Sequence, residues 1–313
     1  MAGSGGGGAF VHRTPEELRD LVRKSEEKTT VAAFEAELSR MLGELLGEFN
    51  SRDAPTVSAR LLQIKSAMKG AIYGSFDQLF GGSVAKHTYV DGLSDIDSLL
   101  LINESDLEGK SPQLALDRMA KIIQADLNGE ATVGYGRMAV TVTYHDGMVI
   151  QLLPALKSPD GQLLVPSSRR EAWSKINPTA FQEALTRRNQ ECSGKLVPVI
   201  KLAKAINGQL PEAQQLSGYH MESLGIAAFK NYKEAMTTSA MLPHFFERAR
   251  ELVMSPITDS TGQSVHVDEY LGPTNSQLRV AASHVLSRIA RRMRNATAAG
   301  STSQWRAIFG IDS

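Results

Sequence analysis

The fold is decided by Gly81-Gly82-Ser83-Val84-Ala85-Lys86-His87-Thr88 and by Ser94-Asp95-Ile96-Asp97-Ser98, which follows a few residues later. The pattern predicts a glycine turn, a short polar helical turn and a strand that continues into the apolar residues 99–102. Asp95 and Asp97 are two residues apart, and side chains with that spacing point to the same face of a strand. Neighbouring carboxylates repel each other, and a divalent cation between them removes the repulsion. The stretch therefore predicts a metal site at the start of a buried strand.

The turn before these acids is suited to a phosphate. Gly81 and Gly82 let the backbone approach an anion closely, and exposed N–H groups in such a turn attract negative charge. Lys86 is long enough to reach a phosphate, and Thr88 is suited to stabilising the turn. Mg²⁺ prefers oxygen ligands and commonly takes some of them from substrate phosphates. Each part alone is common in loops, so their order and spacing are what favour a phosphate cradle beside a metal site.

The complete pattern Gly-Gly-Ser-x-x-Lys-x-Thr-x-x-x-Gly-x-Ser-Asp-x-Asp spans residues 81–97. It resembles the signature of the polymerase-β-like nucleotidyltransferases, and most closely their oligoadenylate synthase and cyclic GMP-AMP synthase-like branch, the CD-NTase family. The resemblance implies an α/β nucleotidyltransferase core with a long N-terminal spine helix and a C-terminal helical lobe. An NTP cleft is then expected between the two lobes, with Gly82 and Ser83 cradling the phosphates.

The same resemblance implies a function. It is the metal-dependent synthesis of a cyclic or linear oligonucleotide second messenger from NTPs, ATP among them, with release of pyrophosphate in anti-phage defence. Such enzymes work with two Mg²⁺ ions, or Mn²⁺, beside the bound NTP, and Asp95 and Asp97 would hold both ions. A regulatory or effector protein is an expected partner.

The third acid of the family pattern is missing. The matching strand reads Val149-Ile150-Gln151-Leu152-Leu153-Pro154-Ala155, so the expected aspartate is Gln151. An amide oxygen brings no charge. Losing a residue that only supports a metal ligand typically lowers metal affinity or activity by roughly 10–100-fold, and the loss of a ligand itself is expected to cost at least as much. Three interpretations are open: a weakened or altered enzyme, a catalytically silent nucleotide-binding sensor or regulator, and an enzyme stalled by an engineered substitution.

Two segments of the C-terminal lobe also match the family. The resemblance implies that the helix Val199-Ile200-Lys201-Leu202-Ala203-Lys204 sends basic side chains to the triphosphate, and Lys201 and Lys204 share one face of that helix. The alternative is a solvated basic edge. In Ser217-Gly218-Tyr219-His220, Ser217 would contact phosphate and Tyr219 would stack on a base. The alternative for Tyr219 is that it begins a buried helix, and His220 is interpreted as structural.

Periodicity and turn residues predict three regions. Residues 1–13 form a Gly/Ser-rich terminus or a remnant of an expression tag, residues 14–170 a nucleotidyltransferase core with N-terminal helices, and residues 171–313 a helical lobe. Asp146 is predicted in a hairpin turn, Pro154 is predicted to end its strand, and no strand is expected after Pro166. Helices are expected at 14–28, 34–49, 56–73, 112–127, 178–192, 195–206, 219–234, 240–254 and 275–298; strands are expected at 97–102, 131–144 and 148–153.

Composition narrows the classes of partner. Lys and Arg together number 34, as do Asp and Glu, so no overall charge recruits nucleic acid or an anionic membrane. The balanced charge and the aromatic content of 6% give little support to the remaining alternative, an RNA 3′-end nucleotidyltransferase. The single Cys192 fits a reducing cytoplasm, and is interpreted as a small buried residue. The sequence has no apolar run long enough to span a membrane.

Overall fold

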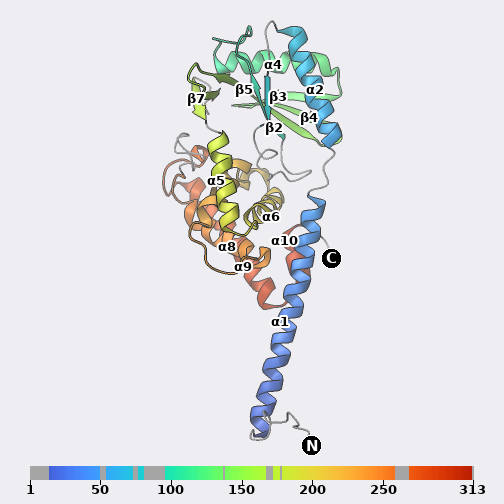
Figure 1. Ribbon diagram of the computed structural model, residues 1–313, viewed down its shortest axis with the longest axis vertical. Coiled ribbons are helices and arrows are strands. Elements are labelled where there is room, and N and C mark those ends of the chain that lie inside the picture. The colour runs from blue at the N-terminus through green and yellow to red at the C-terminus, as the bar shows by residue number, and fades with distance from the viewer. Residues whose placement is uncertain are drawn as a thin grey trace, which may run out of the picture.

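The computed structural model describes residues 14–49, 54–72, 77–80, 96–136, 138–166, 172–176, 178–257 and 268–311. The described residues form two large hydrophobic cores, one between a sheet and two helices and one among helices alone, and a third, small cluster on the sheet. Figure 1 shows the sheet with its helices at one end and the helical lobe below it, with the first helix extending beyond that lobe. This arrangement confirms the predicted α/β core with a helical second lobe.

The first helix, α1, runs without a break over Pro15–Glu48, where two helices were expected. It begins with a capping box in which Thr14 and Glu17 each accept from the other's backbone N–H. No Gly or Pro occurs between Glu16 and Leu42 to end it. The Thr29 and Thr30 hydroxyls donate to carbonyls one turn earlier, so these threonines stay within the helix.

Five strands form a sheet in the order β1-β2-β5-β4-β3. Strands β2 and β5 are parallel, and the other neighbours are antiparallel. The far end of β5 also pairs with β6, which pairs with β7. The bounds are β1 Asp77–Phe80, β2 Ile96–Leu101, β3 Ala131–Tyr135, β4 Val140–Tyr144, β5 Val149–Lys157, β6 Leu163–Pro166 and β7 Trp173–Ile176.

Two helices, α2 (Ala54–Ala71) and α4 (Pro112–Leu127), cover one face of this sheet (Figure 1). Alternate residues of β2 and β5, such as Leu100 and Ile150, point into that core and are buried. The residues between them therefore belong to the opposite face. The alternation thus separates a structural face of the sheet from a face that is available to a site.

Three strand expectations were wrong in detail. The segment 131–144 forms two strands, β3 and β4, paired as a hairpin. Strand β5 does not end at Pro154, because β4 pairs with it only up to Leu152 and β6 only from Leu156, so no ladder bond from that side is lost at the proline. Strand β7 follows Pro166, where no further strand was expected.

The predicted turn at Asp146 is confirmed. Its carboxylate accepts the Met148 N–H and two bonds from the Arg60 guanidinium on α2. Those bonds hold the pKa of the Asp146 carboxyl below its usual range. The same guanidinium carbon lies 3.9 Å from the centre of the Tyr144 ring. Arg60 therefore fastens the β4–β5 turn to α2.

The helical lobe consists of helices that follow β7. The predicted burial of Cys192 is confirmed. Trp305 and Phe309 are also buried, and Trp305 lies on a short final helix that was not predicted. The helix expected to reach residue 234 ends at Ala228. The helices are α5 Pro178–Glu191, α6 Leu196–Gly208, α7 Gly218–Ala228, α8 Thr238–Leu252, α9 Gln277–Ala298 and α10 Thr302–Ile308, with short 3₁₀ turns at 212–214 and 269–271.

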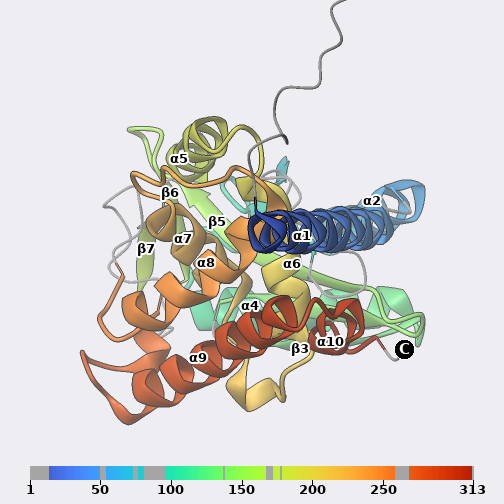
Figure 2. The ribbon, with the colours of Figure 1, turned by 90° about the horizontal axis from the view of Figure 1, so that it is seen from below.

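Helix α1 belongs to the core of this lobe. From Phe34 onward its buried residues join the helical cluster. Figures 1 and 2 show α6, α8 and α10 beside this half of α1. The prediction grouped all the N-terminal helices with residues 14–170, but of the two N-terminal helices found, only α2 packs on the sheet. The predicted boundary at 170/171 and the terminus 1–13 lie outside the described residues.

Candidate functional site

The parallel pairing of β2 with β5 sets the centre of the candidate site. In this register Asp97 is the direct neighbour of Gln151. On the other side of β5, Thr141 of β4 is the neighbour of Gln151. The strand predicted from residue 97 is thus confirmed, and the third-acid position lies beside it. Four further predicted site residues fall outside the described residues: Gly82, Ser83, Lys86 and Asp95.

Gln151 lies on the face of the sheet away from α2 and α4. Its neighbours along the strand, Ile150 and Leu152, are buried in the core beneath those helices, whereas Gln151 is half-buried. Further along β2 and β5 the same face becomes apolar, where Leu99 and Ala155 form a small cluster. The face therefore offers a polar end beside position 97 and an apolar continuation.

The two lysines of α6 are not a solvated edge. Lys201 is 6% exposed and Lys204 is 7% exposed, because α6 is surrounded by other helices of the lobe. The Lys204 Nζ lies 2.7 Å from Oε1 of Glu222 on α7, and the Glu222 side chain is 1% exposed. The alternative interpretation of these lysines is therefore wrong. Removing the two charges of this pair from water costs free energy, which favours a role for the pair beyond stability.

Three predicted site residues meet at the first turn of α7. Ser217 caps the helix, and its hydroxyl accepts the N–H of His220. The Lys204 Nζ lies 3.5 Å from the point where a Cβ on Gly218 would be. The Tyr219 ring is half-buried against Phe181 of α5, with ring centres 4.5 Å apart. Stacking of Tyr219 on a base stays a prediction.

Behind this turn lies a polar network that sequence reasoning missed, and it is buried except at Tyr270 and Ser217. The Tyr270 hydroxyl accepts the N–H of Ser217 and lies 2.8 Å from the Nδ1 of His220. The Arg279 guanidinium, which is completely buried, donates to Asp268 and to carbonyls at the end of α8. Burial lowers the pKa of His220 to about 4, against the pull of Asp268. His220 is thus a neutral structural residue, as predicted.

One signal in the sequence could have revealed this network. Arg279 continues the apolar stripe of α9 that includes Ala282, Leu286 and Ile289, so helical periodicity places an arginine on the buried face. A buried arginine requires an acceptor, and the acid that meets it comes from a separate segment, at Asp268. The position of that acid depends on tertiary structure.

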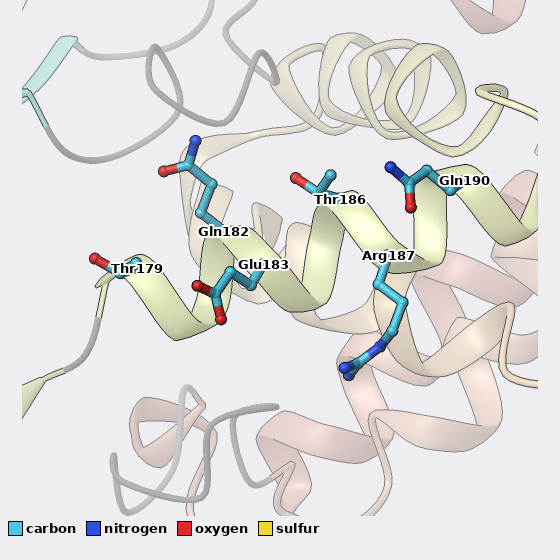
Figure 3. Close-up of a pocket in the computed structure, with 6 residues that line it drawn as sticks. All are labelled: Thr179, Gln182, Glu183, Thr186, Arg187 and Gln190. Atoms are coloured by element: carbon cyan, nitrogen blue, oxygen red, sulfur yellow. The ribbon is translucent and has the colours of Figure 1, made fainter.

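A hollow of about 380 Å³ lies along α5. Figure 3 shows its six labelled side chains along this one helix. The described residues that line the hollow all lie on one polar face of this helix. Within the described parts of the chain, no three His, Cys, Asp or Glu side chains gather as a metal cluster. The lining residues are Thr179, Gln182, Glu183, Thr186, Arg187 and Gln190.

None of the described helices is both long and apolar enough to cross a membrane.

Comparison with known proteins agrees with this geometry. Residues 37–189 match the Second Messenger Oligonucleotide or Dinucleotide Synthetase domain, a region that contains the 81–97 motif and Gln151. No curated protein matches the chain by sequence.

Solved structures share its fold at low sequence identity. CdnG of Bradyrhizobium diazoefficiens in complex with GTP has a TM-score of 0.62 at 15% identity, covering 88% of this chain and 96% of that chain. The DncV cyclic AMP-GMP synthase of Vibrio cholerae has a TM-score of 0.60 at 13% identity, and the match covers 95% of this chain and 91% of that chain. CdnC of E. coli MS115-1 with ATP has a TM-score of 0.57 at 17% identity, and the match covers 90% of this chain and 97% of that chain. Residues 37–189 thus match the second-messenger synthetase domain, and the chain as a whole shares the fold of these solved CD-NTases.

Proposed function

We propose that this chain is a nucleotidyltransferase that joins NTPs into an oligonucleotide second messenger and releases pyrophosphate. The observation that carries the proposal is the register that makes Asp97 the neighbour of Gln151, since it puts the second acid of the motif beside the third-acid position. The matched synthetase domain supports the reaction class. ATP is proposed among the substrates, as CdnC of E. coli MS115-1 was solved with ATP. Cyclic or linear product, anti-phage role and cytoplasmic location stay predictions.

The residues divide into two groups on either side of the substrate. Asp95 and Asp97, with Gln151 as a neutral oxygen ligand, would hold Mg²⁺, and oxygen donors are the type that this ion prefers. When bound, the ion would supply charge neutralisation at the reacting phosphates. Lys204 and Ser217 would steady the β- and γ-phosphates, and Tyr219 would lie against a base. Gly82, Ser83, Lys86 and Lys201 are proposed as further phosphate contacts.

In the reaction a ribose hydroxyl of one nucleotide attacks the α-phosphorus of another. The new phosphodiester bond forms as the bond to pyrophosphate breaks, and the hydroxyl loses its proton. A neutral amide cannot accept that proton, so Gln151 does not serve as the base. On the described strands, the acid nearest to Gln151 in the strand register is Asp97. Correct orientation of the two nucleotides would supply much of the rate enhancement.

The site is tested by removing its acids. Pyrophosphate release and labelled products from mixed NTPs are measured with Mg²⁺ or Mn²⁺ for the unaltered chain and for the Asp95→Asn/Asp97→Asn double variant. We expect the double variant to lose all turnover, because both charged ligands are gone. Unchanged pyrophosphate release in the double variant would exclude this site.

A second variant separates an enzyme from a silent nucleotide binder, the alternative that Gln151 favours. Gln151→Asp restores the third acid, and we expect turnover to rise by about 10–100-fold, as for a recovered metal partner. Gln304→Asp is the matched control, since it makes the same change at an exposed position of α10. If neither the original chain nor Gln151→Asp forms product while both bind NTP, the chain is a sensor or regulator. Binding of a protein partner, as in the CdnC complex with HORMA-deltaN, stays a prediction for this chain.

A further inference from the structure

We propose that Glu222 is a positioning residue that holds the Lys204 ammonium at the first turn of α7, ready for the phosphates of an NTP. The inference rests on the proposed function, since it assigns Lys204 to the phosphates. Sequence motifs did not single out Glu222. Its role follows from where α6 and α7 meet, and it acts through Lys204 without touching the nucleotide.

The contact is short and well defined. Lys204 Nζ donates to Glu222 Oε1 over 2.7 Å, and both side chains are almost completely buried. Glu222 is four residues after Gly218, so the two share a face of α7. Gly218 has no side chain to occupy that face, and the ammonium lies 3.5 Å from where its Cβ would be. The lysine head is therefore fixed between the helix start and the carboxylate.

Electrostatics explain why a carboxylate is needed there. Lys201, one turn earlier on the same face of α6, is also buried. Removing water from a cation costs free energy, and a second cation nearby adds repulsion. Glu222 offsets both effects for Lys204. A nearly buried carboxylate cannot itself approach the nucleotide, whose phosphates it would repel.

Stability alone does not account for such a pair. Buried ion pairs are often no more stabilising than apolar residues of similar size, because the cost of removing water from both charges is large. What the pair does provide is a fixed direction for one charged group. A phosphate-binding cation that is already oriented loses less rotamer entropy when the ligand arrives. The geometry thus points to preorganisation of Lys204.

The test measures binding of a fluorescent ATP analogue to the full chain, without turnover. We expect Glu222→Gln to weaken binding by about tenfold, the effect of losing a charge-assisted hydrogen bond that orients a cation. Glu222→Asp keeps the charge but shortens the side chain, so the affinity of this variant for the ATP analogue should lie between those of the unaltered chain and Glu222→Gln. Glu247→Gln is the control, since it removes a carboxylate that pairs with Arg250 on its own helix, α8, and with Arg294 on α9, and should leave binding unchanged.

Folding is controlled by a neutral pair. Lys204→Met/Glu222→Met removes both charges and should keep the thermal midpoint near that of the original chain, yet it should not bind the nucleotide. Equal or tighter binding by Glu222→Gln, or normal binding by the double methionine variant, would overturn the inference. If the unaltered chain binds no nucleotide, the proposed function fails first, so the two failures are distinguishable.

Discussion

At the scale of single residues, burial decides what a charged group does. Lys204 and Arg279 are both inside the helical lobe, and each meets a carboxylate at hydrogen-bond distance. Arg279 also donates to four backbone carbonyls near its acid, so its role is structural. Lys204 lies instead beside the start of α7, where two other candidate site residues, Ser217 and Tyr219, are found. The same residue chemistry therefore serves the fold in one place and the site in the other.

His220 gives a pH-dependent prediction at this scale. Its folded pKa of about 4 lies below the ordinary value of 6.5, because burial disfavours the charged ring. Between those values the unfolded chain binds a proton that the folded chain does not. Stability is therefore expected to fall as pH drops from about 6.5 towards 4, by at most about 1.4 kcal/mol per pH unit.

The measurement compares urea unfolding at about pH 7 and about pH 5. His220→Asn keeps a polar atom where Nδ1 faces Tyr270 but cannot titrate in this range. The unaltered chain should lose more stability between the two pH values than the variant. The groups that face the ring, namely Asp268, Arg279 and Tyr270, are present in both proteins, so equal losses would contradict the assignment to His220.

At the scale of elements, the contact between α6 and α7 is close because Gly225 has no side chain. A Cβ there would lie 2.7 Å from Cδ1 and 2.8 Å from Cγ1 of Ile200, which is completely buried. This close approach of α6 and α7 brings Lys204 and Glu222 within hydrogen-bond distance. A small residue on α7 thus supports the ion pair one turn away.

Gly225→Ala is expected to destabilise the protein by about 1–3 kcal/mol, because the added methyl group overpacks the contact. Gly43→Ala makes the same change in α1, where nothing lies within 4 Å, and should instead stabilise by about 0.5–1 kcal/mol through helix propensity. Denaturant unfolding of both variants measures the difference. Effects of the same sign would contradict the packing argument.

At the scale of the whole molecule, the two cores are separate clusters with one tryptophan each. Trp173 packs against the sheet core, and Trp305 is buried in the helical core. Leu38 of α1 belongs to the helical core. A cavity made in that core should therefore be reported first by Trp305.

We expect Leu38→Ala to cost about 2–5 kcal/mol of stability in the helical lobe. Trp173→Phe leaves Trp305 as reporter, and Trp305→Phe leaves Trp173. In denaturant unfolding, the midpoint seen by Trp305 should fall more than the one seen by Trp173. Equal shifts of the two midpoints would indicate that both lobes unfold as a single unit.

Much of the fold could be predicted from local signals. Ser111 and Pro112 mark the start of α4, Gly147 marks the hairpin, and apolar periodicity locates α5, α6 and α9. The motif strand at 96–101 was also predicted, because an apolar run after Asp97 has few other interpretations. Pro154 was misinterpreted, since whether a proline interrupts a strand depends on which neighbour is absent there.

The sequence by itself determined the residue types of the candidate site and the order in which they occur, because motif spacing is local. Only the tertiary structure decided that position 97 lies beside Gln151, that α1 packs with the helical lobe, and that Lys204 meets Glu222. These are contacts between segments far apart in the chain. They depend on strand register and helix packing, which no single stretch of sequence specifies.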